Sequence, residues 1–179
     1  MEHFNTTDLV SVHRQWKHTY FDVFTTIVFD KQRLPIELLK RKIQIVHFMV
    51  EKKLLGTRLE KFPPENRIQF IGYPEHIDGI NLPHYHLLVR FPEYVKNETP
   101  NGRISDYRRL LEGFWGDKFV KPSHKVLVEL ESGVIRFVSN RYCDVQKIES
   151  QRVVDYCTKS LKNHPTHEDH IIFNEYPFR

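Results

Sequence analysis

The sequence predicts an α/β (α+β) fold in which strands and helices interleave and the helices cover one face of a sheet. Short runs of β-branched and aromatic residues occur along the chain, and stretches with apolar residues at three- and four-residue steps lie between them. The 179 residues, 40% of them hydrophobic, contain no repeat or low-complexity tract. We therefore expect a single domain over 1–179, with its core at about 20–162 and a polar C-terminal tail at 163–179.

Six segments are rich in the residues that favour strands. The predicted strands are 20–29, 67–72, 84–91, 125–130, 134–138 and 143–148. The second and third are expected to pair like a hairpin, because the loop at 73–83 between them contains Pro74, Gly79 and Pro83.

Three segments have helical spacing of apolar residues. The predicted helices are 35–54, 104–114 and 150–161. Proline is favoured in the first turn, so Pro35 is expected to open the first helix. Ser105 is a candidate cap of the second helix, and the Gly113 and Gly116 pair is expected to mark its end.

Composition excludes several classes of protein. The longest apolar runs fall well short of a membrane span, and the N-terminus lacks the basic and apolar regions of a secretory signal, so we expect a soluble, unexported protein. The two cysteines, Cys143 and Cys157, form neither a disulfide framework nor a C-x-x-C zinc motif. The net charge of +4 permits a phosphate-bearing partner without requiring one.

The segment LPHYHLLV at 82–89 carries the most informative pair of residues. Alternate residues of a strand share a face, so His84 and His86 are expected to project together and could bind one divalent cation. The alternative is that both histidines simply belong to the polar face of an amphipathic strand.

A second motif is Tyr-x-x-Lys in the last predicted helix. Tyr156 and Lys159 are three residues apart, so the phenol and the ammonium occupy neighbouring positions on the helix surface. The alternative is an ordinary solvated helix face. If a cation held by the histidines withdrew charge from a phosphodiester, Tyr156 could attack phosphorus and Lys159 could stabilise the phosphate charge. The product would be a phosphotyrosine link.

The order and context of these motifs resemble the HUH endonucleases, specifically the single-tyrosine replication initiators of rolling-circle plasmids and small single-stranded DNA viruses. FTTIVF at 24–29 resembles their first motif, PHYHLLV at 83–89 the second, and CDVQKIESQRVVDYCTKSL at 143–161 the strand and helix of the third. DYCTK is the most specific piece. The His-Tyr-His form of the second motif is more usual in plasmid and phage relatives than in eukaryotic viruses, where His-x-Gln is common.

The resemblance implies a ferredoxin/RRM-like central antiparallel sheet with flanking helices, the HUH nuclease fold. It also implies Mg²⁺ or Mn²⁺ as the cofactor and a third, acidic ligand just before the histidine pair, a position that Glu75 occupies. His76 and Asp78 are rivals for that role, and each of the three could instead be an ordinary turn residue.

Two sets of residues could contact DNA. The cations of the predicted helices could line a DNA path, with solvated helix surface as the alternative; they are Lys40, Arg41, Lys42, Arg103, Arg108 and Arg109. Some aromatic residues could stack on bases, although most must build the core; the candidates are Tyr85, Phe114, Trp115 and Tyr142.

The resemblance implies a site-specific single-strand endonuclease and strand transferase that initiates rolling-circle replication through a covalent 5′-phosphotyrosine at Tyr156. Its partners would be single-stranded DNA at a replication origin, an origin hairpin, and a host helicase and polymerase. The sequence has no G-x-x-x-x-G-K-[ST] motif, so either the nuclease uses a host helicase or the chain is a fragment of a longer initiator. It would work in the cytoplasm of the host cell, or in the nucleus of a eukaryotic host. The alternatives are a tyrosine transposase of the same superfamily and a non-catalytic ferredoxin-like nucleic-acid-binding module.

Overall fold

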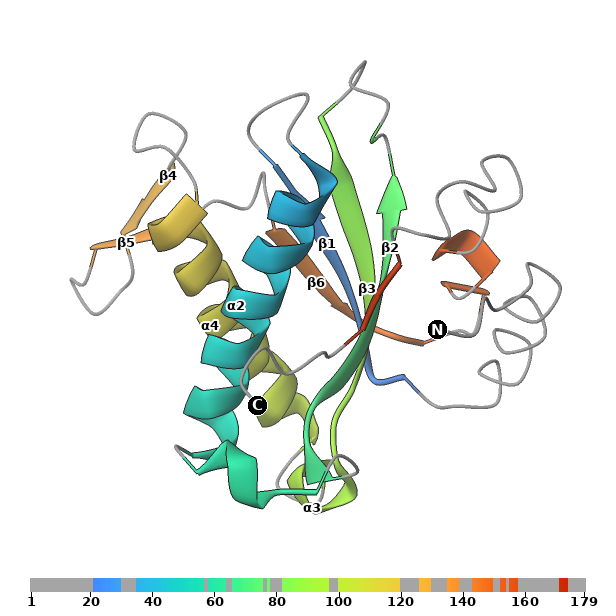
Figure 1. Cartoon of the computed structure of the whole chain (residues 1–179). Helices are drawn as coiled ribbons and strands as arrows, with labels where there is room; N and C mark the ends of the chain where they lie inside the picture. The colour runs from blue at the N-terminus through green and yellow to red at the C-terminus, as the bar shows by residue number, and fades with distance from the viewer. Residues whose placement is uncertain are drawn as a thin grey trace, which may run out of the picture.

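The computed structural model is a mixed α+β fold in which five antiparallel strands form the main sheet (Figure 1). It describes residues 21–29, 35–56, 58–63, 66–75, 77, 82–96, 100–119, 126–129, 135–138, 143–149, 152–153, 155–157 and 171–173. The strands are β1 (Val23–Val28), β2 (Gln69–Glu75), β3 (His84–Arg90), β6 (Cys143–Lys147) and β7 (Ile172–Phe173). Their order across the sheet is β6-β1-β3-β2-β7, so the predicted hairpin partners β2 and β3 lie beside one another near the centre.

Two long helices, α2 (Ile36–Leu55) and α4 (Pro100–Phe119), pack together on one face of this sheet (Figure 1). The short elements α3 (Glu93–Lys96) and a 3₁₀ turn (Leu59–Lys61) connect larger ones. β4 (Val126–Glu129) and β5 (Ile135–Val138) form a separate two-stranded sheet beside α4. Among the described residues, no helix combines the length and the apolar character that a membrane crossing requires.

The helix α4 is longer than the sequence predicts at both ends. It begins at Pro100, so Ser105 lies inside it rather than at its cap, and it continues through Gly113 and Gly116. A glycine inside a helix costs about 1 kcal/mol relative to alanine. Burial outweighs this cost, because Tyr107, Leu111 and Trp115 recur at four-residue steps and are all buried against the sheet.

Strand alternation divides the buried residues between the two faces of the sheet. The larger cluster lies under α2 and α4 and includes Ile27 of β1 and Leu87 of β3. The smaller cluster lies on the opposite face, where Tyr73 and Leu88 pack with Cys157. Residues 155–157 are helical, so the prediction that helices cover only one face is wrong: this helical turn covers part of the second face.

The C-terminal segment contributes an edge strand that the sequence prediction placed in a polar tail. Ile172 of β7 pairs with Gly72 of β2 and is buried. A Cβ atom at Gly72 would lie 2.6 Å from Cγ1 of Ile172 and 2.7 Å from Cδ2 of Leu87. Glycine at this position therefore leaves room for Ile172, so that β7 can pair with β2 at the edge of the sheet.

Candidate metal centre

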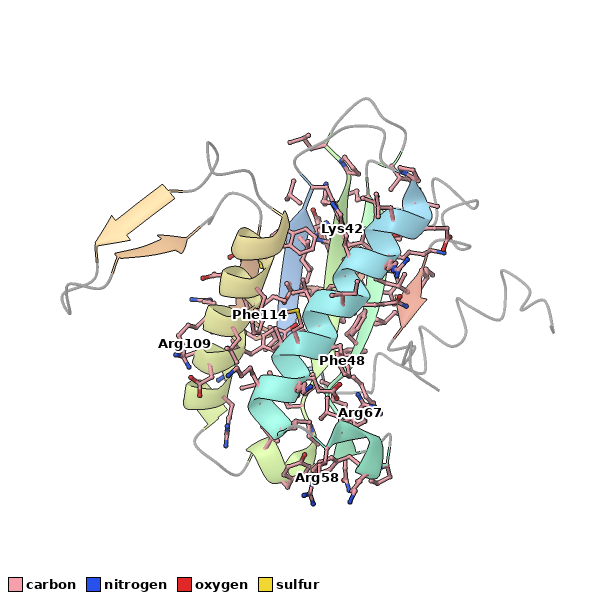
Figure 2. The ribbon with its side chains drawn as sticks, turned by 60° about the vertical axis from the view of Figure 1, so that its left-hand side comes forward. Lys42, Phe48, Arg58, Arg67, Arg109 and Phe114 are labelled. Atoms are coloured by element: carbon pink, nitrogen blue, oxygen red, sulfur yellow. The ribbon has the colours of Figure 1, made fainter. Side chains whose placement is uncertain are left out.

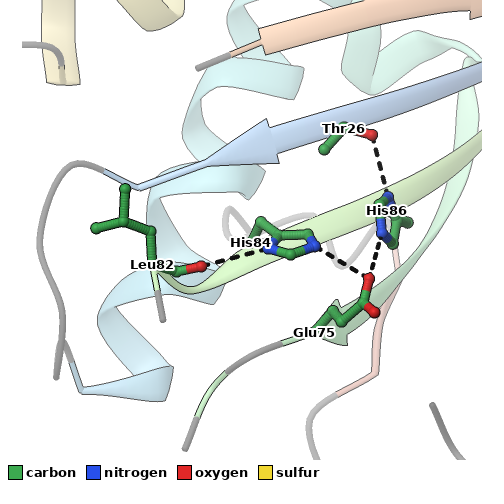
Figure 3. A network of polar contacts seen from close by, with 5 residues as sticks. All are labelled: Thr26, Glu75, Leu82, His84 and His86. Atoms are coloured by element: carbon green, nitrogen blue, oxygen red, sulfur yellow. Dashed lines mark hydrogen bonds and ion pairs between the residues drawn. The ribbon is translucent and has the colours of Figure 1, made fainter. Parts of the chain in front are cut away.

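Two histidines and one carboxylate meet on the sheet face opposite α2 and α4. His84 and His86 alternate along β3, and Glu75 on β2 is the direct cross-strand partner of His84. Oε2 of Glu75 lies 3.0 Å from Nε2 of His84 and 2.7 Å from Nε2 of His86 (Figure 3). One ligand atom from each residue falls within 4.8 Å of the other two, close enough for a single ion to reach all three.

The position of Glu75 follows from the length of β2. The sequence places residues 73–83 in a loop, whereas β2 continues through Pro74 to Glu75. The strand therefore fixes the backbone of Glu75 in register with His84. His76 and Asp78, the rival ligands, lie outside the described residues.

The second ring nitrogen of each histidine has its own partner (Figure 3). Nδ1 of His84 lies 3.3 Å from the carbonyl oxygen of Leu82, and Nδ1 of His86 lies 3.1 Å from Oγ1 of Thr26 on β1. A carbonyl only accepts hydrogen bonds, so Nδ1 of His84 must carry the proton. When Nε2 of His84 releases the proton that it donates to Glu75, its lone pair becomes available to a cation.

The charge of Glu75 suits a cation. Burial by itself raises the pKa of the Glu75 carboxyl. Hydrogen bonds from His86 and His84 and the charges of those rings together lower the pKa by more than burial raises it, so it lies below its ordinary value. Side-chain exposure rises across the cluster, from 7% at His86 to 16% at His84 and 30% at Glu75. An ionised carboxylate is thus accessible from solvent beside two imidazoles.

Tyr156 lies on the same face as the three candidate ligands. Its ring centroid is 5.2 Å from that of His86 and 6.3 Å from that of Phe24, with an edge-on geometry to both. The neighbouring Cys157 is buried against the sheet, whereas Tyr156 is 51% exposed. The helical turn therefore anchors itself through Cys157 and presents the phenol beside the histidine pair.

The phenol of Tyr156 is neutral at pH 7. Burial raises its pKa above the ordinary value, and the nearby charge of Glu75 raises it further. A positive charge next to Glu75 would oppose the second of these effects. The pKa of Tyr156 would therefore depend on whether the Glu75 cluster holds a cation.

Among the described residues, the structure brings none of the other sequence candidates to this centre. Lys159 and Tyr142 lie outside the described residues. Tyr85 and Trp115 are buried in the core under the helices, which removes them as base-stacking candidates. Phe114 is partly buried and packs against the same core.

The six candidate DNA-binding cations all lie on α2 and α4, as Lys42 and Arg109 illustrate in Figure 2. Two of them form ion pairs within their own helix, Lys40 with Glu37 and Arg109 with Asp106, each at 3.0 Å. Arg108 donates a hydrogen bond to the carbonyl oxygen of Val145 in β6. The sheet separates these helices from the Glu75 cluster, so one phosphate group cannot contact both.

Two residues at the site were not singled out from the sequence. Thr26 contacts His86 as described above, and the ring of Phe24 stacks on His86 at a centroid distance of 5.2 Å and an interplanar angle of 22°. Both lie in the FTTIVF segment, and alternate residues of a strand share a face. Their role depends on the β1–β3 register, which the motif alone does not specify.

Comparisons with protein-family models, with curated proteins and with solved structures found no match to this chain.

Proposed function

We propose that this chain is a metal-dependent single-stranded DNA endonuclease and strand transferase of the HUH type, which initiates rolling-circle replication through Tyr156. The observation that carries the proposal is the placement of Tyr156 against His86, on the same sheet face as the Glu75, His84 and His86 cluster. A central antiparallel sheet with two helices on its other face is compatible with the ferredoxin-like fold that this function implies.

The donor set fits a divalent cation. It consists of two imidazole nitrogens and one carboxylate oxygen that converge from two neighbouring strands, with the second nitrogen of each ring already hydrogen-bonded. Glu75 adds a carboxylate oxygen, the ligand type that Mg²⁺ and Mn²⁺ favour. Such an ion, when bound, would neutralise charge on the non-bridging oxygens of a phosphodiester and raise the electrophilicity of phosphorus.

The residues of the chain would then carry the transfer. Oη of Tyr156 attacks phosphorus and gives up its proton, a P–O bond to Tyr156 forms, and the bond from phosphorus to the 3′ oxygen breaks. The 3′ oxygen leaves as a hydroxyl after taking up a proton, and the 5′ phosphate stays on Tyr156. Attack by a later 3′ hydroxyl reverses these steps and rejoins the strand. We assign to Lys159 the stabilisation of phosphate charge during the transfer.

The proposal is tested with a pool of random single-stranded oligonucleotides that carry a fluorophore at the 3′ end. The protein is expected to form a labelled adduct on a denaturing gel when Mn²⁺ is present, and to lose it on chelation. Peptide mapping is expected to place the label on Tyr156. His84→Ala and His86→Ala are expected to lose the adduct while they retain most of their DNA affinity, because phosphate contacts dominate that affinity.

The matched control is Tyr94→Phe. Tyr94 is also exposed, but its hydroxyl donates a hydrogen bond to the carbonyl oxygen of Asn66, and it belongs to α3. We expect Tyr156→Phe to abolish the adduct and Tyr94→Phe to preserve it. DNA binding by the wild-type protein without any adduct would reject the nuclease and favour a nucleic-acid-binding module.

A further inference from the structure

We propose that Thr26 is a positioning residue of the metal centre, which holds the imidazole of His86 so that Nε2 faces the cation. Thr26 on β1 is the direct cross-strand partner of His86 on β3, so their side chains leave the sheet on the same face. Oγ1 of Thr26 lies 3.1 Å from Nδ1 of His86, a hydrogen-bonding distance (Figure 3). The inference rests on the proposed function only through the metal centre, not through DNA cleavage.

The chemistry of the hydroxyl explains why threonine suits this position. A histidine that binds a metal through Nε2 carries its proton on Nδ1, and that proton needs an acceptor. The hydroxyl of Thr26 can accept it. The same hydroxyl can also donate to Nδ1 when Nε2 is protonated toward Glu75, so Thr26 satisfies His86 both with and without an ion.

The two histidines therefore depend on different partners. His84 is oriented by the main-chain carbonyl of Leu82, which no substitution removes, whereas His86 depends on a side chain. Stacking against Phe24 restrains the plane of the His86 ring. Stacking does not fix which edge of the ring faces Thr26, however, because a ring turned over by 180° would stack equally well and place Cδ2 there instead of Nδ1. The hydrogen bond to Thr26 holds Nδ1 on that side, and Nε2 then lies toward Glu75.

The test compares Mn²⁺ affinity, measured by calorimetry, in the wild type and in Thr26→Val. Valine keeps the volume and the β-branch of threonine and removes only the hydroxyl. We expect a loss of about 10- to 100-fold in Mn²⁺ affinity, the usual effect of removing a hydrogen-bond partner of a metal ligand. Thr26→Ser restores the hydroxyl and is expected to recover most of that affinity.

Thr25→Val is the matched control. Thr25 is the adjacent residue of β1, but it is fully buried on the face that α2 and α4 cover. It should leave Mn²⁺ affinity unchanged, and thermal melting checks that each variant remains folded. A spectroscopic readout separates positioning from general damage: in the Mg²⁺-bound protein, the ¹⁵N shifts of His86 should report a protonated Nδ1 in the wild type and in Thr26→Ser.

The outcomes separate this inference from the proposed function. Equal Mn²⁺ affinity in the wild type and Thr26→Val, or a Thr26→Ser variant as weak as Thr26→Val, would overturn the role of Thr26 and leave the nuclease proposal intact. Weaker binding by Thr26→Val in a protein that forms no DNA adduct would support Thr26 and reject the nuclease. Failure of the wild type to bind Mn²⁺ would overturn both.

Discussion

Glu51 and Glu75 are both paired with basic side chains, yet their surroundings differ. Glu51 of α2 is buried, and its carboxylate accepts hydrogen bonds from Nη2 of Arg67 at 2.6 Å and from Nε of Arg67 at 3.1 Å. It also accepts the backbone N–H of Ile68 at 3.0 Å. Glu75 is partly exposed and shares a single oxygen between His84 and His86.

The difference lies in what the nitrogen partners can offer. A guanidinium remains protonated and has no lone pair, so the Glu51–Arg67 pair can only be kept or broken. An imidazole can give up a proton and present a lone pair to a cation. We infer that the first carboxylate holds α2 to the segment before β2, and that the second can exchange its hydrogen bonds for a metal ion.

The largest effect on stability is expected from breaking the buried pair. Arg67→Leu leaves the Glu51 carboxylate without its cation in the protein interior, which should lower the free energy of unfolding by about 3–5 kcal/mol. Urea denaturation measures this. A loss below about 1 kcal/mol would show that the buried pair contributes no more to stability than a surface ion pair does.

The corresponding change in the open cluster should affect binding and not stability. Glu75→Gln removes the charge of a proposed direct ligand, so Mn²⁺ affinity should fall by at least about 100-fold, or roughly 3 kcal/mol. The free energy of unfolding without metal should change by less than about 1 kcal/mol, because the group is partly exposed. Calorimetry and urea denaturation give the two values, and a large loss of stability would make the cluster structural.

The buried region should also be the more sensitive to acid. Burial, and then the positive charge of Arg67, lower the pKa of His47 from 6.5 to about 3. Because the unfolded chain protonates this histidine first, stability is full above pH 6.5 and falls as the pH drops from 6.5 toward 3. By pH 5 the loss should reach about 2 kcal/mol.

His47→Phe removes the titrating group and keeps an aromatic ring against Phe70, whose centroid lies 4.3 Å away. Urea denaturation of this variant at pH 7 and pH 5 should show a smaller difference than the wild type shows. Equal differences in the two proteins would assign the acid sensitivity to other groups.

The sequence predicts the central strands well because runs of β-branched and aromatic residues, and the alternation of side chains between two faces, are local properties of a strand. The predictions from sequence are wrong where tertiary packing decides how far a helix extends or whether a segment forms a strand. The helix α4 continues through Gly113 because the burial of Tyr107 and Trp115 outweighs the local preference of that glycine. Ile172 joins the sheet because Gly72, one hundred residues earlier, leaves room for it.

At the candidate site, too, local sequence predicts some contacts and tertiary packing determines the others. His84 and His86 share a face by strand periodicity, so their pairing could be inferred from two positions in the sequence. The contact between Thr26 and His86 requires the register of two strands sixty residues apart. The Glu51–Arg67 pair, which joins a helix to the segment before β2, has no local sequence signal at all.

Pulsed electron paramagnetic resonance of bound Mn²⁺ tests the central claim most directly, because it detects the ligand nitrogens themselves. We expect one Mn²⁺ per chain with ¹⁴N couplings from two imidazoles, and loss of one coupling in His84→Ala and in His86→Ala. Mn²⁺ that binds without nitrogen couplings, or couplings that persist in both variants, would show that these histidines do not hold the ion.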